Sequence, residues 1–202
     1  MLIMSDSFLE ALAVPKPIPG GGGAAAHGAC VGLALLEKIV LVELRRQQTT
    51  SESPWLSLLE EVKKSSATIR QLRDEDGIAY MRLAKTKTFG SSDAETLTAL
   101  REATESPIKI MEEAKTALEL AARAGKHCKG HLLSDLLVVC ELLRAAIDGG
   151  GHIAEANLDM MKDPFLRSHY QKKLNQVQSE SGEQFRSVEE DILARAKIGK
   201  KM

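Results

Sequence analysis

No excess of charge of either sign marks this sequence. It carries 27 lysines and arginines against 28 aspartates and glutamates, which gives a formal net charge of -1. Nucleic acids and anionic membranes both favour proteins with a clear basic excess or a basic stripe. We therefore expect neither as a partner. The 202 residues suffice for one sizeable core, and we predict a single domain over residues 1–202.

Cysteine is also scarce. Cys30, Cys128 and Cys140 are odd in number, and no pair has CxxC spacing. This pattern suits reduced, buried thiols in the cytoplasm better than a disulfide framework. Residues 1–4 lack the basic start of a signal peptide, which also favours a cytoplasmic protein. The histidines and cysteine between Gly125 and Leu133 lack a recognisable zinc spacing, so we predict no metal site.

No stretch shows the alternation of apolar and polar residues that marks a strand. Apolar residues recur at helical spacing instead, and caps, prolines and glycines divide the chain into helices. We expect helices from Ser7 to before Pro15, from the glycines at 20–23 to about Gln48, from Ser53 to Phe89, from Ser92 to Ser106, from Pro107 to Gly125, from Leu132 to Ile147 with a break or kink at Gly149–Gly151, and from Asp163 onward. The sequence therefore predicts an all-α, up-and-down helical bundle.

The stretch Pro17–Leu36 organises this bundle. Two prolines hold its start extended, Gly20–Gly23 let the backbone approach another group closely, and the following helix begins with unpaired N–H groups that attract anions. Ala24, Gly28 and Gly32 then recur at spacing four, which allows close helix packing. We expect this Gly/Ala-rich helix to lie at the centre of the fold. Its Pro/Gly-rich start and its histidine argue against a membrane span.

Two acidic residues fall on apolar helical stripes. Asp76 continues a seven-residue repeat formed with Trp55, Val62, Ile69 and Leu83. The alternative is that the helix bends or frays near Gly77 and that Asp76 reaches solvent.

Asp135 points away from the charged side of its helix, although Ser134 and Asp135 can also simply cap the helix start. Asn157 lies on an apolar stripe as well, either to bind substrate or to tie two helices together. Buried carboxyl groups in a cleft are candidates for proton transfer or for stabilising a cation.

The sequence resembles the cyclodeaminase/cyclohydrolase family, which includes the C-terminal domain of formiminotransferase-cyclodeaminase and bacterial methenyltetrahydrofolate cyclohydrolases. The matching segments, in chain order, are Phe8–Ala13, Pro17–Gly22 with the Ala/Gly helix, Asp76–Tyr80, Ala103–Pro107, and Ser134–Asp135 with an apolar helix ending in Asn157–Leu158. Order and spacing agree over nearly the whole chain, and only the last helix is not diagnostic.

This resemblance implies an all-α homodimer that acts on the one-carbon unit between N5 and N10 of tetrahydrofolate. Formiminotetrahydrofolate cyclodeaminase forms the methenyl cation and releases ammonia, whereas the related cyclohydrolase adds water to that cation. The resemblance implies Asp135 and Asp76 as catalytic residues and no redox cofactor or metal. The candidate substrate-binding residues are Gly20, Gly21, Gly22, Ser134, Asn157, His131 and Tyr80.

Several positions depart from the family pattern. Gly23 replaces a serine, and His131, Ile153 and Leu41 stand where the family has asparagines. The alternative to an enzyme is therefore a catalytically silent helical dimer that binds a folate-like ligand or a protein partner. We expect the two acids to meet the glycine turn in one cavity if the chain is an enzyme.

Overall fold

The computed structural model describes residues 7–46, 53–89 and 92–199 of the chain. These residues form six α-helices and one short 3-10 helix, and no strand occurs among them. The elements, in order, are α1 (Ser7–Leu12), α2 (Gly21–Arg46), α3 (Pro54–Phe89), α4 (Asp93–His127), η1 (Gly130–Leu132), α5 (Leu133–Leu158) and α6 (Pro164–Gly199). The predicted all-α fold is confirmed.

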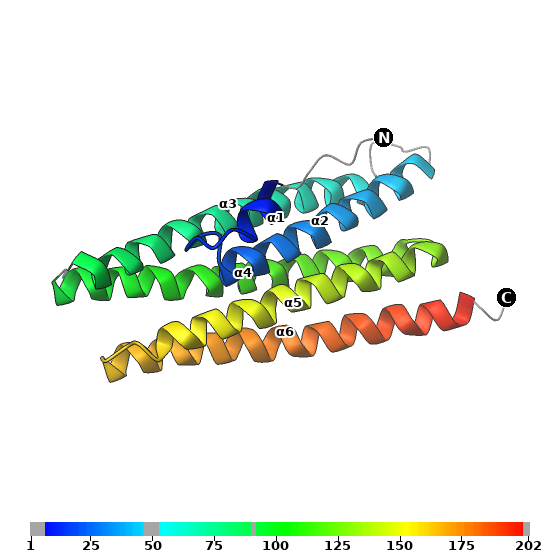
Figure 1. The fold of residues 1–202 in the computed structure, drawn as a ribbon. Coiled ribbons are helices and arrows are strands. Elements are labelled where there is room, and N and C mark those ends of the chain that lie inside the picture. Colours follow the sequence, from blue (N-terminus) through cyan, green and yellow to red (C-terminus); the bar gives the residue numbers. More distant parts are fainter. Residues whose placement is uncertain (1–6, 47–52, 90–91, 200–202) are drawn as a thin grey trace.

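Four long helices form the bundle, and a fifth covers one side of it (Figure 1). α2 packs against α3 and α5, α4 packs against the same two helices, and α6 lies on α4 and α5. Consecutive long helices run in opposite directions, as an up-and-down bundle requires. α1 lies across α2 and α3, where Phe8 stacks on His27 and the Arg73 guanidinium lies over the Phe8 ring.

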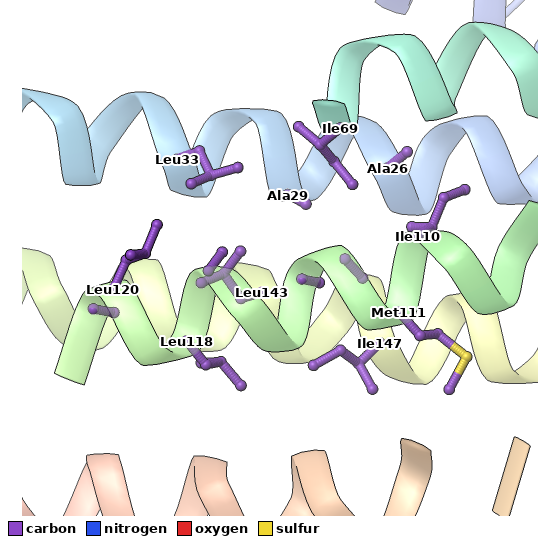
Figure 2. Close-up of a cluster of buried hydrophobic side chains, with 14 of the residues drawn as sticks. Ala26, Ala29, Leu33, Ile69, Ile110, Met111, Leu118, Leu120, Leu143 and Ile147 are labelled. Carbon is purple, nitrogen blue, oxygen red and sulfur yellow. The ribbon is translucent and has the colours of Figure 1, made fainter. Parts of the chain in front are cut away.

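The core consists of aliphatic side chains where α2, α3, α4 and α5 meet. Figure 2 shows Ala26, Ala29 and Leu33 on α2, together with Ile110 on α4 and Leu143 on α5. All five are fully buried. Small residues on α2 opposite larger ones on its neighbours let these helices pack closely, and each large side chain contributes roughly 1.5–3 kcal/mol by leaving water.

The helix starts follow the predicted caps. Ser92 and Glu95 form a capping box at α4, in which each residue's side chain accepts a hydrogen bond from the other's backbone N–H. The Asp163 carboxylate accepts hydrogen bonds from the N–H groups of Phe165 and Leu166 at α6. These caps satisfy N–H groups that have no partner within the helix.

Two predicted breaks are absent. α4 runs through Pro107 as one helix instead of ending at Ser106, and α5 runs through Gly149–Gly151 without interruption. In both places contacts with neighbouring helices outweigh the local preference of proline or glycine to end a helix.

The three consecutive glycines of α5 face three different helices. A Cβ atom on Gly149 would lie 3.2 Å from the Ala25 Cβ of α2, and one on Gly150 would lie 2.8 Å from the Met111 Cγ of α4. A Cβ atom on Gly151 would lie 2.9 Å from the Gln178 Nε2 of α6. The glycines therefore let α5 approach all three neighbours closely at one level of the bundle.

The position predicted for the Gly/Ala-rich helix was wrong. α2 is not central, because α4 packs against all four other long helices whereas α2 packs against three, and α6 covers α4 and α5. Among the described residues it is the one helix long and apolar enough to cross a membrane by length and composition, and only 39% of its most apolar stretch is buried. Small residues indicate close approach to a neighbour, which is a different property from central burial.

Candidate functional site

Asp76 lies on α3. Its side chain packs against the start of α2, at the glycine turn of residues 20–23. Its side chain is 9% exposed. The carboxylate accepts a hydrogen bond from the backbone N–H of Gly23 and another from Ser106 on α4, whose Oγ lies 3.1 Å from Asp76 Oδ1. Three helices therefore meet at one carboxyl group. The prediction that Asp76 faces the core is confirmed, and α3 neither frays nor ends at Gly77.

Glycine at position 22 is a steric requirement of this arrangement. A Cβ atom on Gly22 would lie 2.4 Å from Asp76 Oδ2, closer than real Cβ contacts allow. The carboxylate therefore occupies the space that any other residue's side chain would need. A side chain at position 22 would therefore displace the Asp76 carboxylate.

Burial raises the pKa of the Asp76 carboxyl above its ordinary value, because the ionised form loses its hydration. The hydrogen bonds from Ser106 and from the Gly23 N–H favour the ionised form and oppose this shift in part. Both partners are uncharged. A buried carboxyl held by neutral donors can gain or lose a proton closer to neutral pH than a surface aspartate does.

A groove between α3 and α4 lies beside this site. It has a volume of about 320 Å³ and is lined in part by Ser106, Ile78 and Lys109, but Asp76 is not among its lining residues. It continues into a wider cavity of about 540 Å³ toward the far end of α3, past the ion pair of Arg82 with Glu102. Ser106 is thus both a partner of Asp76 and part of the groove wall. The sequence analysis included Ser106 in a matching segment but did not assign it to the site.

Ile153 of α5 covers the glycine turn from the other side. A Cβ atom on Gly21 would lie 2.9 Å from the Ile153 Cδ1. Position 153 is one of those where the family pattern has an asparagine, so an apolar methyl group contacts the turn where an amide was expected.

Asn157 ties two helices together. Its Nδ2 donates to the Ala103 carbonyl oxygen on α4 at 2.7 Å. In a regular helix this carbonyl would accept from the N–H of residue 107, but Pro107 has no N–H. The Asn157 amide therefore satisfies the acceptor that the proline leaves unpaired, and its N–H₂ group is engaged in the scaffold.

Asp135, Ser134 and His131 lie at the opposite end of α2. Asp135 is half-buried in the first turn of α5, and Ser134 and His131 are exposed. α5 contacts the glycine turn through Ile153, so Asp135 lies 18 residues away, about 27 Å along the same helix. The expectation that both acids meet the glycine turn within one chain was wrong. Helical register predicted which side of its helix each acid lies on. It gave no information about the position of each acid along the bundle axis.

A second buried carboxylate, which the sequence analysis did not predict, lies near Asp135. Glu43 of α2 is 0% exposed, and its Oε1 accepts the Lys129 N–H at 2.8 Å. The Arg46 guanidinium donates to its Oε2 at 2.6 Å. Glu43 follows Leu36, Ile39 and Val40 on the buried side of α2, so its helical register was the available signal. It fixes the loop that leads into α5.

Two ends of the bundle can now be distinguished. The glycine-turn end contains Gly20–Gly23, Asp76 and Ser106, and the loop end contains Lys129–Leu132, Glu43 and Asp135. Tyr80 lies one turn beyond Asp76 with about half of its side chain exposed. No group of three or more histidine, cysteine, aspartate or glutamate residues in the described part of the chain is placed to hold a metal ion. Cys30, Cys128 and Cys140 are free thiols, and burial raises the pKa of each.

Comparison with known proteins agrees with the resemblance seen in the sequence. A family described as formiminotransferase-cyclodeaminase matches residues 4–176. The solved structure of formiminotetrahydrofolate cyclodeaminase from Thermotoga maritima is similar in fold, with a TM-score of 0.82 and 19% identity over 93% of this chain and 94% of that chain. No curated protein matches the chain in sequence. Because the family match spans most of the sequence, the chain belongs to the formiminotransferase-cyclodeaminase family.

Proposed function

We propose that this protein is a folate one-carbon enzyme, a formiminotetrahydrofolate cyclodeaminase that converts 5-formimino-tetrahydrofolate to 5,10-methenyl-tetrahydrofolate and ammonia. Membership of the family and the likeness in fold support folate one-carbon chemistry. One observation carries the proposal. Asp76 is a buried carboxyl group with a raised pKa, set against the glycine turn at the start of α2, and its hydrogen-bond donor Ser106 forms part of a groove wall.

The reaction needs a proton to move between two nitrogens. N10 of the folate attacks the carbon of the protonated formimino group and gives up its own proton, and the resulting amino group leaves as ammonia when it receives that proton, which leaves the positive charge on the methenyl product. A carboxyl group whose pKa is raised toward neutral can accept the first proton and supply the second. We assign this role to Asp76. Its ionised form also attracts and stabilises the positively charged methenyl product, and this attraction is stronger in buried surroundings than in water.

The remaining candidates receive binding roles in this proposal. Gly20, Gly21 and Gly22 are candidates to bind the folate or its carboxylate tail through their backbone N–H groups, because unpaired N–H groups at a helix start favour an anion. The space beside Gly21 and Gly22 on their Cα side is filled by Ile153 and Asp76. Ser134, His131, Tyr80 and the Oδ1 of Asn157 are candidate hydrogen-bonding groups. We propose that Asp135 is the second catalytic carboxyl group. The enzyme would work in the cytoplasm as a homodimer, without a metal or redox cofactor.

Direct assay tests this proposal. Incubation with 5-formimino-tetrahydrofolate should give growth of the methenyl absorbance and release of ammonia. Incubation with 5,10-methenyl-tetrahydrofolate should show whether the same protein accelerates its decay beyond the spontaneous rate, which would identify a cyclohydrolase. Absence of turnover with both substrates would contradict the enzyme proposal.

A second candidate function is a catalytically silent helical dimer that binds a folate-like ligand or a protein partner. The contact of Ile153 with Gly21 favours it, because an apolar side chain lies where the family has an amide. Calorimetry with tetrahydrofolate distinguishes the two. If the protein is an enzyme, tetrahydrofolate should bind with an affinity that changes in Asp76→Asn. If the protein is a silent scaffold, tetrahydrofolate should show no binding that depends on this carboxyl group.

A further inference from the structure

The hydroxyl group of Ser106 is directed away from its own helix. Serine and threonine inside a helix commonly donate to the carbonyl oxygen three or four residues earlier. On α4, Thr98, Thr104 and Thr116 all donate to the carbonyl four residues earlier, at 2.9, 2.7 and 3.1 Å. Ser106 instead donates to Asp76 on α3. Its proton therefore binds a neighbouring helix and not its own backbone.

Asn157 removes a competing acceptor for this hydroxyl. The Ala103 carbonyl lies three residues before Ser106, and Pro107 leaves it without the N–H that a regular helix would supply. An unpaired carbonyl at this position would attract the Ser106 hydroxyl. The Asn157 amide donates to that carbonyl at 2.7 Å instead. The amide of Asn157 therefore leaves the Ser106 proton available for Asp76.

The Asp76 carboxylate depends on such donors for a fixed orientation. The last torsion of an aspartate side chain joins an sp³ carbon to an sp² carbon, so its preferred angles are broad. Ser106 holds Oδ1 from α4, and the Gly23 N–H donates to the carboxylate from α2. Ser106 and Asp76 are 8% and 9% exposed, so water has little access to compete for their hydrogen bond.

Charged and titratable groups surround this pair on every helix packed against it. On α3 and α4 they are Arg73, Glu75, Arg82, Glu102, Glu105 and Lys109. On α2 the titratable residue of the first two turns is His27, which stacks on Phe8, and on α1 it is the exposed Glu10. The pKa of Asp76 is shifted by burial and by its hydrogen bonds from Ser106 and Gly23. Loss of the Ser106 hydroxyl should therefore be visible in the titration of Asp76.

We propose that Ser106 is a positioning residue for the proposed reaction. Its hydroxyl holds Asp76 Oδ1, keeps the carboxylate against the glycine turn, and favours the ionised form that accepts the first proton. Asn157 supports this role through its bond to Ala103. The inference deepens the proposed function and rests on it for the role of Asp76, but the contact itself can be tested without any activity.

Kinetics test the positioning role. In Ser106→Ala, kcat should fall by about 10- to 100-fold, the factor that a hydrogen bond to a charged group represents, with KM little changed. The acid limb of the pH profile of kcat/KM should move to higher pH, because the ionised carboxyl loses a donor. Ser106→Thr, which keeps the hydroxyl, should restore both. An unchanged profile in Ser106→Ala, or a Ser106→Thr protein as slow as Ser106→Ala, would overturn the inference.

Ser181→Ala on α6 is the matched control. Ser181 is also buried and lines a different groove, between α5 and α6, but its hydroxyl donates to the Val177 carbonyl of its own helix at 2.6 Å. The same loss of a buried hydroxyl should here leave kcat and the pH profile unchanged. Losses as large as those of Ser106→Ala would show a general effect of removing a hydroxyl and would overturn the inference.

Carbon-13 NMR of the carboxyl groups tests the contact without turnover. The Asp76 signal is the one absent from Asp76→Asn. Its titration midpoint should lie at higher pH in Ser106→Ala than in the wild type or in Ser181→Ala. Asn157→Leu should move the midpoint in the same direction by a smaller amount. An unchanged midpoint in Ser106→Ala would overturn the inference, and an unchanged midpoint in Asn157→Leu would overturn the supporting role of Asn157.

The two measurements separate this inference from the proposed function. If the Asp76 midpoint moves in Ser106→Ala but the wild-type protein turns over neither folate, the contact stands and the proposed function fails. If the wild type turns over a folate and the midpoint does not move, the proposed function stands and Ser106 is not a positioning residue.

Discussion

Each end of the bundle buries one carboxylate. Glu43 at the loop end belongs to α2, Asp76 at the glycine-turn end packs against α2 from α3, and the two have different hydrogen-bond partners. Asp76 has neutral donors, the Gly23 N–H and the Ser106 hydroxyl, and its pKa is raised by burial. Glu43 has a guanidinium, that of Arg46, and the N–H of Lys129. A buried acid without a counter-charge is suited to exchanging a proton, whereas a buried acid paired with a cation is suited to holding a loop. Burial of an acid alone therefore does not identify a catalytic group.

The largest effect should follow from removing the proton carrier at the glycine-turn end. Asp76→Asn keeps the shape and can still accept from Gly23, but it cannot transfer a proton. We expect turnover of the formimino substrate to fall by roughly 10²–10⁴-fold, with the fold retained in circular dichroism. The control Glu43→Gln, at the other buried acid, should retain turnover within about tenfold if Glu43 acts only on the loop. Equal losses in both variants would contradict the contrast.

Filling the space beside Asp76 should have the next largest effect. Gly22→Ala puts a Cβ atom onto the Asp76 carboxylate, so the Asp76 side chain must rotate away from its partner Ser106, or α2 and α3 must move apart. We expect the free energy of unfolding to fall by roughly 1–3 kcal/mol in urea titration, with loss of turnover.

The matched control for Gly22→Ala is Gly182→Ala on α6. The nearest atom to its new Cβ would be the Arg186 Nη1 at 4.0 Å. Its free energy of unfolding should stay unchanged or rise by up to about 1 kcal/mol, because alanine is the better helix former. A stable Gly22→Ala protein would show that Asp76 is not held as closely as described.

At the loop end, Glu43→Ala should lower the free energy of unfolding by roughly 1–3 kcal/mol, because the Lys129 N–H loses its acceptor and Arg46 loses its carboxylate partner. Glu43→Gln, which keeps an acceptor oxygen, should cost less. Hydrogen exchange should also be faster at Lys129 and in the first turn of α5 in Glu43→Ala. Protection that is unchanged there would argue against a role for Glu43 in holding the loop.

A smaller effect is expected from Asn157→Leu, which leaves the Ala103 carbonyl without its donor. We expect a loss of about 1 kcal/mol, since Asn157 is only partly buried and water can replace part of the bond. Combining it with Pro107→Ala should remove most of this loss, because the new N–H at position 107 can pair with the same carbonyl. Additive losses in the double variant would contradict this coupling.

The pH dependence of stability should sharpen the comparison further. The pKa of Asp76 is raised by folding, so the folded state binds its proton more tightly than the unfolded chain does. The stability that this group contributes is therefore present at low pH and is lost as pH rises from the unfolded pKa, about 3.9, through the raised folded pKa. Asp76→Asn has no titrating group at this position and should not show that loss. As pH rises through this range, the free energy of unfolding of the variant should therefore increase relative to that of the wild type, and the difference should level off at higher pH.

The sequence predicted the helical class, most helix ends and the burial of Asp76, because these depend on caps and on helical periodicity. It could not predict that Asp135 lies far from Asp76. Periodicity gives the direction of a side chain around its helix axis, whereas the meeting of two residues also depends on their height along the bundle, which is set by packing. Pro107 and the glycines of α5 were predicted to interrupt helices for a related reason, since the contacts that keep these helices whole come from other parts of the chain.

The three adjacent glycines of α5 have a consequence for how this family can diverge. Gly149 faces Ala25 of α2, and Gly150 faces Met111 and the Pro107 carbonyl of α4, so a larger residue at either position needs a compensating change in a separate part of the gene. Gly151 faces the end of the flexible Gln178 side chain, which can move aside. We expect natural variants to keep small residues at positions 149 and 150 even where the folate chemistry has been lost, which would make this pair a record of ancestry more durable than the catalytic acids.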